Sequence, residues 1–203
     1  MLWGGSLGGL EVRKSREGGF HLRGTFPYGA RTTLSDGGRN GGRPRKEEFA
    51  PRAFAYNVER EDVNIMFLSG HRWDKPLASR KAGTLKLQDS DDALTFDAVI
   101  STEVQETSWA RDFMAAFAAG LVLGLSPGFR LPPQRTVKNA ETIKEEDPAE
   151  GNALIRVVNH ALLWEVSAVT KAAYEEAQIE ARNWTPDPAT RLHKPTPAYR
   201  WRA

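Results

Sequence analysis

Residues Ala153 to Val169 read ALIRVVNHALLWEVSAV, an apolar run rich in β-branched and other strand-forming side chains. An apolar run of this kind is typical of a buried strand. It is longer than most single strands, so we expect the chain to bend within it. The run therefore predicts that buried β-structure forms the core of the fold.

The segments that precede this run repeat the strand pattern. Short stretches rich in β-formers and separated by turn residues predict antiparallel strands over Leu10–Lys14, Gly19–Phe26, Val63–Leu68, Gly83–Leu87, Ala93–Ile100 and Val122–Leu131. Apolar residues at helical spacing predict helices over Glu106–Ala119, Phe49–Val58 and Tyr174–Arg182. Together these elements predict an α+β fold, a mainly antiparallel β-barrel with two or more flanking helices.

The 203 residues are enough for one domain with its own core. We expect this domain to cover residues 9–182, after a flexible N-terminus over residues 1–8. Residues 36–46 are rich in glycine and nearly free of apolar side chains, which predicts a mobile loop within the domain. Residues 183–203 combine prolines with basic residues and predict a disordered basic tail.

Composition excludes several classes of site. The chain has no cysteine, which rules out disulfides, thiolate nucleophiles and cysteine-ligated zinc or iron–sulfur centres. No stretch approaches the roughly 20 apolar residues of a membrane span, so we expect no membrane partner. The body lacks a basic stripe with interleaved aromatic residues, so a nucleic-acid partner is not expected.

Candidate catalytic residues are few, because the chain has four histidines and most of its serines lie in turns or in the tail. His71 follows a predicted buried strand, and Gly70 before it would allow another backbone to approach. Ser126 lies in Leu123–Phe129, which reads LGLSPGF, where glycines leave space around the hydroxyl. On local sequence alone, each of the two also fits a structural role. His21 and His193 are assigned structural roles.

Four blocks in a fixed order connect these residues. Gly70–His71 is followed by a strand pair and a helix, then by GLSPGF at Gly124–Phe129, then by LWEVSAVT at Leu163–Thr170. This order resembles the prohead maturation serine proteases of tailed phages, a family similar in fold to the herpesvirus assembly protease. The resemblance extends from about Gly24 to about Ala177.

The resemblance implies that Ser126 is the nucleophile and His71 its base. A serine hydroxyl needs a base to take its proton, and an imidazole can do this near neutral pH. The third member of the triad is Glu165 or His160, which would point to opposite faces of an unbroken strand. We favour Glu165, and the alternative is His160. Ser167 is a weaker rival for the nucleophile, because no glycine flanks it.

The groups that would stabilise the oxyanion are less defined. Pro127 follows Ser126 and has no N–H to donate. Gly128, Arg130 or an ordered water is the candidate donor, and the sequence does not choose among them.

The resemblance implies a serine endopeptidase that needs no metal and no other cofactor. Its substrates would be scaffold segments of the major capsid protein precursor and its own tail, cleaved inside the immature capsid in the host cytoplasm. Related enzymes also imply that the chain forms a homo-oligomer. Two alternatives remain at this point: a noncatalytic assembly or scaffold protein on the same fold, and a nucleic-acid-binding β-barrel that uses the basic loop Arg39–Lys46 and the tail.

Overall fold

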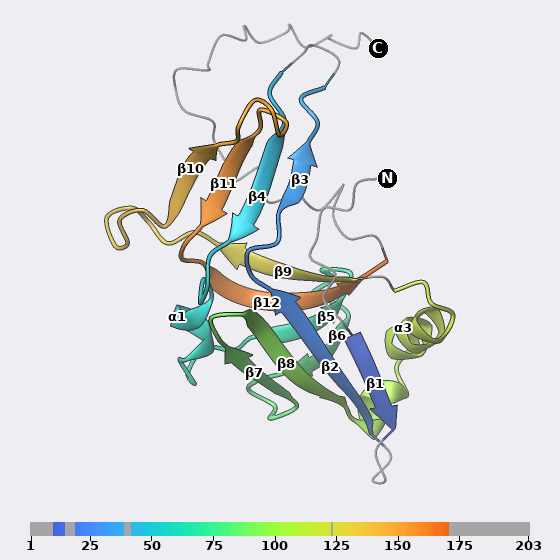
Figure 1. Ribbon diagram of the computed structural model, residues 1–203. Coiled ribbons are helices and arrows are strands. Elements are labelled where there is room, and N and C mark those ends of the chain that lie inside the picture. The colour runs from blue at the N-terminus through green and yellow to red at the C-terminus, as the bar shows by residue number, and fades with distance from the viewer. Residues whose placement is uncertain (1–9, 15–18, 39–41, 123, 171–203) are drawn as a thin grey trace, which may run out of the picture.

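The structure is a computed structural model that describes residues 10–14, 19–38, 42–122 and 124–170 (Figure 1). The expected helix over residues 174–182 and both expected chain ends, residues 1–8 and 183–203, lie outside the described residues. Within them the chain forms three four-stranded sheets and three helices.

Each sheet is named here after its central strands. The β2–β8 sheet has the order β1 (Leu10–Lys14), β2 (Phe20–Pro27), β8 (Ala93–Ile100), β7 (Leu85–Asp89). The β12 sheet has the order β6 (Pro76–Ser79), β5 (Met66–Ser69), β12 (Leu162–Val169), β9 (Gly124–Arg130). The β11 sheet has the order β10 (Glu141–Glu145), β11 (Leu154–Val158), β4 (Arg45–Phe49), β3 (Thr32–Ser35).

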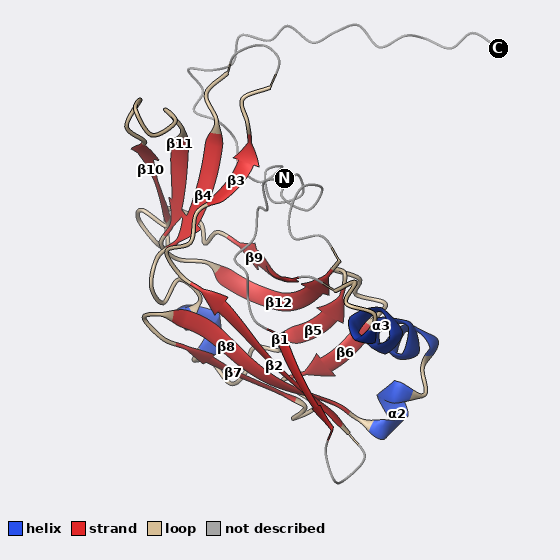
Figure 2. Ribbon diagram, turned by 45° about the vertical axis from the view of Figure 1, so that its right-hand side comes forward, coloured by secondary structure: helices blue, strands red, loops and turns tan. Residues whose placement is uncertain are grey.

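The main core lies between the β2–β8 sheet and the β12 sheet. Phe67 of β5 and Phe96 of β8 meet across it with ring centroids 5.0 Å apart. Helix α3 (Ser108–Ala118) adds Phe113, whose ring lies 6.3 Å from that of Phe67. Figure 2 shows α3 and the short α2 (Thr102–Gln105) at the same end of the two sheets. Apolar residues alternate along these strands, so one face of each sheet is buried.

Aromatic rings join the remaining parts to this core. Phe54, just before α1 (Ala55–Val58), is fully buried and contacts the rings of Phe26, Phe49 and Phe129. These rings come from β2, β4 and β9, one strand of each sheet. In both ribbon views the β11 sheet projects from the side of the molecule where β9 and β12 lie.

The expected α+β class with mainly antiparallel strands and flanking helices is confirmed. Two pairings are parallel, β4 with β11 and β5 with β12. None of the sheets formed by the described strands closes on itself, so the barrel is not confirmed.

Two local expectations need correction, and one is confirmed. Arg45 and Lys46, expected in the mobile loop, lie in β4 and pair with β11. The helix expected from Phe49 begins only at Ala55, because Phe49 ends β4 opposite Val158. The bend expected within 153–169 is present, since the chain leaves the β11 sheet after residue 158 and enters the β12 sheet at residue 162.

Candidate active site

Strand β12 carries the candidate site on the face that points away from the main core. Val166 and Ala168 pack in the core. Glu165 and Ser167, which alternate with them along the strand, therefore point to the opposite face. On the neighbouring strand β9, Ser126 pairs with Ser167. Residues paired across a sheet point to the same side, so the side chains of Ser126, Glu165 and Ser167 share one face.

A β-bulge decides which way Glu165 points. Leu163 pairs with Phe129 and Glu165 pairs with Gly128, so Trp164 is an extra residue on β12. Without it, Leu163 and Glu165 would lie on the same face. With it, Leu163 is fully buried in the core while Glu165 points to the opposite side.

Glu165 and His71 form the central contact of the site. Glu165 Oε1 lies 2.5 Å from Nδ1 of His71. The side chain of Glu165 is 5% exposed and that of His71 is 20% exposed. A nearly buried carboxylate on Nδ1 orients an imidazole and stabilises its protonated form. The contact thus matches the geometry of a base and its orienting acid.

A tight turn after β5 presents His71. Gly70 has φ 64° and His71 has φ 57°, and the N–H of Arg72 donates to the carbonyl of Ser69 at 3.3 Å. Two central residues with positive φ define a type I′ turn. A Cβ on Gly70 would meet nothing within 4 Å. Gly70 therefore serves the left-handed backbone, and the expected close approach of another backbone is wrong.

The hydroxyl of Ser167 connects the two members of this contact. Ser167 Oγ accepts the backbone N–H of His71 at 2.9 Å and donates to Oε2 of Glu165 at 2.6 Å. The side chain is fully buried. Histidine tolerates a positive φ better than most residues, but the conformation still requires support from its surroundings. Ser167 and Glu165 supply that support from β12.

Gly128 leaves the space that the carboxylate of Glu165 occupies. A Cβ at this position would lie 2.0 Å from Oε1 of Glu165 and 2.6 Å from its Cδ. Any side chain on β9 here would therefore push the carboxylate away from His71. The glycine that the sequence placed beside Ser126 makes room for Glu165.

Ser126 is half-buried on β9, directly opposite Ser167. Paired residues of neighbouring strands have Cβ atoms about 5 Å apart, which puts the side chain of Ser126 next to that of Ser167, on the face of the sheet that carries Glu165. Strand β9 is the last strand of its sheet within the described residues. Pro127 fits such an edge strand because it has no N–H to pair.

The other two named candidates lie elsewhere. His160 is exposed in the link between β11 and β12, where its backbone N–H donates to Ala140 at 3.0 Å. His160 and Glu165 therefore do not share one unbroken strand, and the alternation argument does not apply to them. Arg130 is exposed at the end of β9, opposite Leu162.

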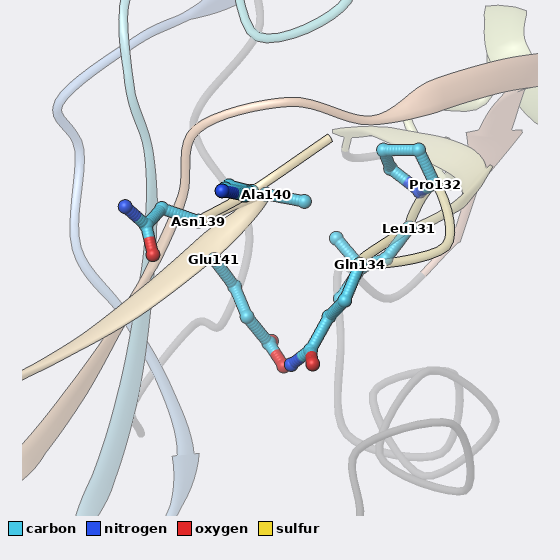
Figure 3. Close-up of a pocket in the computed structure, with 7 residues that line it drawn as sticks. Leu131, Pro132, Gln134, Asn139, Ala140 and Glu141 are labelled. Atoms are coloured by element: carbon cyan, nitrogen blue, oxygen red, sulfur yellow. The ribbon is translucent and has the colours of Figure 1, made fainter. Parts of the chain in front are cut away.

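An open cavity of about 420 Å³ lies where the chain leaves β9 (Figure 3). It is lined by Leu131, Pro132, Gln134, Lys138, Asn139, Ala140 and Glu141, so none of the candidate site residues lines it. In Figure 3 the ends of Gln134 and Glu141 point toward each other. Glu141 is also bound to Arg156, whose Nε donates to it at 2.7 Å.

The described residues contain no group of three or more His, Cys, Asp or Glu side chains that could hold a metal ion. Over the same part of the chain, no helix is long and apolar enough to cross a membrane.

Comparison with known proteins adds one match. The family model described as caudovirus prohead serine protease matches residues 35–190. A search of curated proteins and a search of solved structures gave no match. The matched range contains every residue of the candidate site.

Proposed function

The chain belongs to the caudovirus prohead serine protease family, and from this premise we propose that it is a serine endopeptidase with Ser126, His71 and Glu165 as its catalytic triad. Membership implies a role as a phage prohead protease, acting within the procapsid in the host cell on capsid precursor proteins. The residue roles, the substrate segments and self-cleavage are the parts of this proposal that go beyond the family.

In the proposed reaction His71 takes the proton of the Ser126 hydroxyl as Oγ attacks the scissile carbonyl carbon. The tetrahedral intermediate then collapses, the peptide C–N bond breaks, and His71 gives its proton to the leaving amine. Water attacks the acyl-enzyme in the same way, with His71 again as base, and Ser126 is regenerated. Glu165 holds the imidazole through Nδ1 and stabilises its charged form.

The observation that carries this proposal is the 2.5 Å contact between His71 Nδ1 and Glu165 Oε1, beside Ser126 on the adjacent strand. A structural histidine needs no carboxylate and no strained backbone, yet His71 has both. Strained residues are found preferentially at functional sites, which favours a catalytic role.

Burial favours Ser126 over Ser167 as the nucleophile. The hydroxyl of Ser167 is fully buried and bound to Glu165, whereas Ser126 is half-buried. A substrate carbonyl can approach only a hydroxyl that is at least partly accessible. For the oxyanion, Gly128, Arg130 and an ordered water remain the proposed donors, because Pro127 has no N–H.

We propose the scaffold segment of the major capsid protein precursor as the main substrate and residues 183–203 as a site of self-cleavage. That tail lies outside the described residues. Self-association into a homo-oligomer is also proposed, on the resemblance alone.

The test of catalysis compares labelling by a fluorophosphonate with processing of a co-expressed capsid precursor. Wild-type protein should be labelled at Ser126 and should process the precursor. Ser126→Ala should lose labelling and processing, and His71→Ala should slow both by about 10⁴-fold or more. Matched controls are Ser90→Ala in the β7–β8 turn and His21→Ala on β2, both of which should behave as wild type.

Processing by the Ser126→Ala variant at the wild-type rate would refute the assigned nucleophile. An unlabelled wild-type protein that still supports shell assembly would favour the noncatalytic assembly protein instead.

Self-cleavage has a separate readout. Mass spectrometry of assembled particles should find the wild-type chain shortened within residues 183–203 and the Ser126→Ala chain intact. An intact wild-type tail after assembly would remove self-cleavage from the proposal and leave the triad untouched.

A further inference from the structure

Ser167 occupies a position that the proposed triad does not use. It lies on β12, two residues after Glu165 and opposite Ser126, and its side chain is fully buried. Its hydroxyl closes a ring of contacts that runs from His71 Nδ1 to Glu165 Oε1, from Glu165 Oε2 to Ser167 Oγ, and from Ser167 Oγ to the backbone N of His71.

The direction of each hydrogen bond in this ring follows from chemistry. A backbone N–H can only donate, so Ser167 Oγ accepts from His71 at 2.9 Å. The single hydroxyl proton of Ser167 is then free for Glu165 Oε2, 2.6 Å away. A carboxylate that accepts this proton with one oxygen presents its other oxygen as an acceptor, so Nδ1 of His71 is the donor. The Nε2 atom of the neutral ring then carries the lone pair that takes a proton.

We infer that Ser167 is a positioning residue, which holds the backbone turn of His71 and the carboxylate of Glu165 together and so fixes the tautomer of the His71 ring. This inference rests on the proposed function, because a fixed tautomer matters only if His71 acts as the base. It assigns Ser167 no contact with the substrate.

The two parts of His71 that Ser167 affects are otherwise independent. The left-handed backbone at φ 57° is set in the turn, and the ring orientation is set by Glu165. One hydroxyl on β12 connects both, so the imidazole is held at its backbone and at its ring by the same strand. A hydroxyl that merely satisfied a buried N–H would not need to contact the carboxylate.

The test measures which ring nitrogen of His71 carries the proton. It uses ¹H–¹⁵N correlation spectra of the protein with ¹⁵N-labelled histidine, recorded at a pH where the imidazole is neutral. The chain has four histidines, and the signals lost in a His71→Gln variant identify those of His71. Wild-type protein should carry the proton on Nδ1. Ser167→Ala should shift the ring toward the tautomer with the proton on Nε2.

A second readout is the rate at which a fluorophosphonate labels Ser126. By analogy with groups that orient metal-bound imidazoles, Ser167→Ala should slow labelling about 10- to 100-fold. The pair Ser167→Thr and Ser167→Val differs in the hydroxyl at nearly constant volume, so Thr should keep the tautomer and most of the rate while Val loses both. Thr107→Ala, which removes the N-cap hydroxyl of α3, is the control for lost stability and should change neither readout.

The outcomes separate the two proposals. An unchanged His71 tautomer and labelling rate in both Ser167→Ala and Ser167→Val overturns the positioning role and leaves the triad standing. No labelling of wild-type protein, together with a tautomer that depends on the Ser167 hydroxyl, supports the positioning contact and overturns the proposed catalysis. If Ser167→Ala does not fold, the comparison of Thr with Val decides.

Discussion

The carboxylate of Glu165 lies so close to the backbone of Gly128 that a methyl group there would sit 2.0 Å from Oε1. The far end of a glutamate can usually move aside, but here its movement would break the contacts with His71 and Ser167. At the scale of single residues, the candidate site is therefore sensitive to a single added carbon on β9.

Gly128→Ala should reduce the rate of fluorophosphonate labelling of Ser126 about 10- to 100-fold. Its cost to folding should be about 1–3 kcal/mol, as for other overpacked positions, measured by urea unfolding. The matched control is Gly19→Ala, whose Cβ would lie 3.2 Å from Val99 in the β2–β8 sheet, away from the site. If the Gly128→Ala variant is labelled at the wild-type rate, the reactivity of Ser126 does not depend on the present position of the Glu165 carboxylate.

Sequence reasoning predicted Ser126, His71 and Glu165 as the triad through blocks that follow the order of a known family, and the structure brings His71 and Glu165 into contact. Sequence reasoning also named Ser167, as a weaker rival for the nucleophile, because alternate residues of a strand share a face and Ser167 follows Glu165 by two. The closeness of Gly128 to Glu165 could not be predicted, since it depends on the register of β9 against β12 and on the bulge between them. Neither leaves a local signal in the sequence.

At the scale of elements, β4 shows why a strand of paired charged residues is not recognised from its sequence. Its residues Arg45–Phe49 read RKEEF, which has the polarity of a loop. In the sheet these charges have partners: Lys46 contacts Glu146 at 2.5 Å, and buried Glu47 contacts Arg156 at 2.7 Å. Partners this far along the chain become apparent only when the pairing of β4 with β11 is known.

The contact of Lys46 with Glu146 predicts a specific acid sensitivity. Glu146 is nearly buried, and its hydrogen bond from Lys46 holds the pKa of its carboxyl below the ordinary 4.5. A carboxyl with a lower pKa in the folded chain stabilises the fold above its ordinary pKa, and this stabilisation is lost as the pH falls through the lowered value.

Urea unfolding of wild type and Glu146→Gln should therefore differ most at neutral pH, and the difference should shrink as the pH falls below about 4.5. Glu145→Gln is the matched control, because its side chain is 76% exposed, and its difference from wild type should stay small at every pH. A Glu146→Gln difference that does not change with pH would contradict the assigned pKa shift.

At the scale of the whole molecule, part of the core comes from outside the matched family range. That range starts at residue 35, whereas β2 ends at Pro27. Yet Leu22 and Phe26 of β2 are 1% and 6% exposed, and β2 pairs with β8 along its whole length. The segment before the family range is thus required by the fold.

Deletion of residues 1–28 should abolish cooperative urea unfolding, whereas deletion of residues 1–14, which among the described elements removes the edge strand β1 alone, should preserve it. Each large buried side chain of β2 contributes about 1.5–3 kcal/mol to the free energy of unfolding, and the hydrogen bonds of β2 with β8 are lost as well. The total free energy of unfolding of a domain is only about 5–15 kcal/mol, so these losses should be enough to unfold it. Five of the six tryptophans remain in both shortened chains and supply the fluorescence signal. A cooperative transition in the shorter chain would show that β2 is dispensable.

The barrel expectation, which is not confirmed, belongs to this same scale. Turn residues between neighbouring segments predict hairpins, such as β7 with β8, and that pairing is present. The parallel pairings of β4 with β11 and of β5 with β12 join segments distant in sequence and carry no turn signal. The strand and helix patterns in the sequence predict the α+β class, but the division of the strands into three sheets depends on these distant pairings.

Pro127 on β9 bears on how copies of the protein could pair at high protein concentration. An exposed strand edge invites copies of a protein to join into continuous sheets, and natural proteins interrupt such edges with residues that cannot donate. Pro127 is itself buried, but it has no N–H, so β9 lacks a backbone donor next to the candidate nucleophile and a strand from a second copy could not pair with it there. Continuous strand pairing between copies along β9 would then be interrupted at this residue, which is a condition for staying unaggregated at high protein concentration.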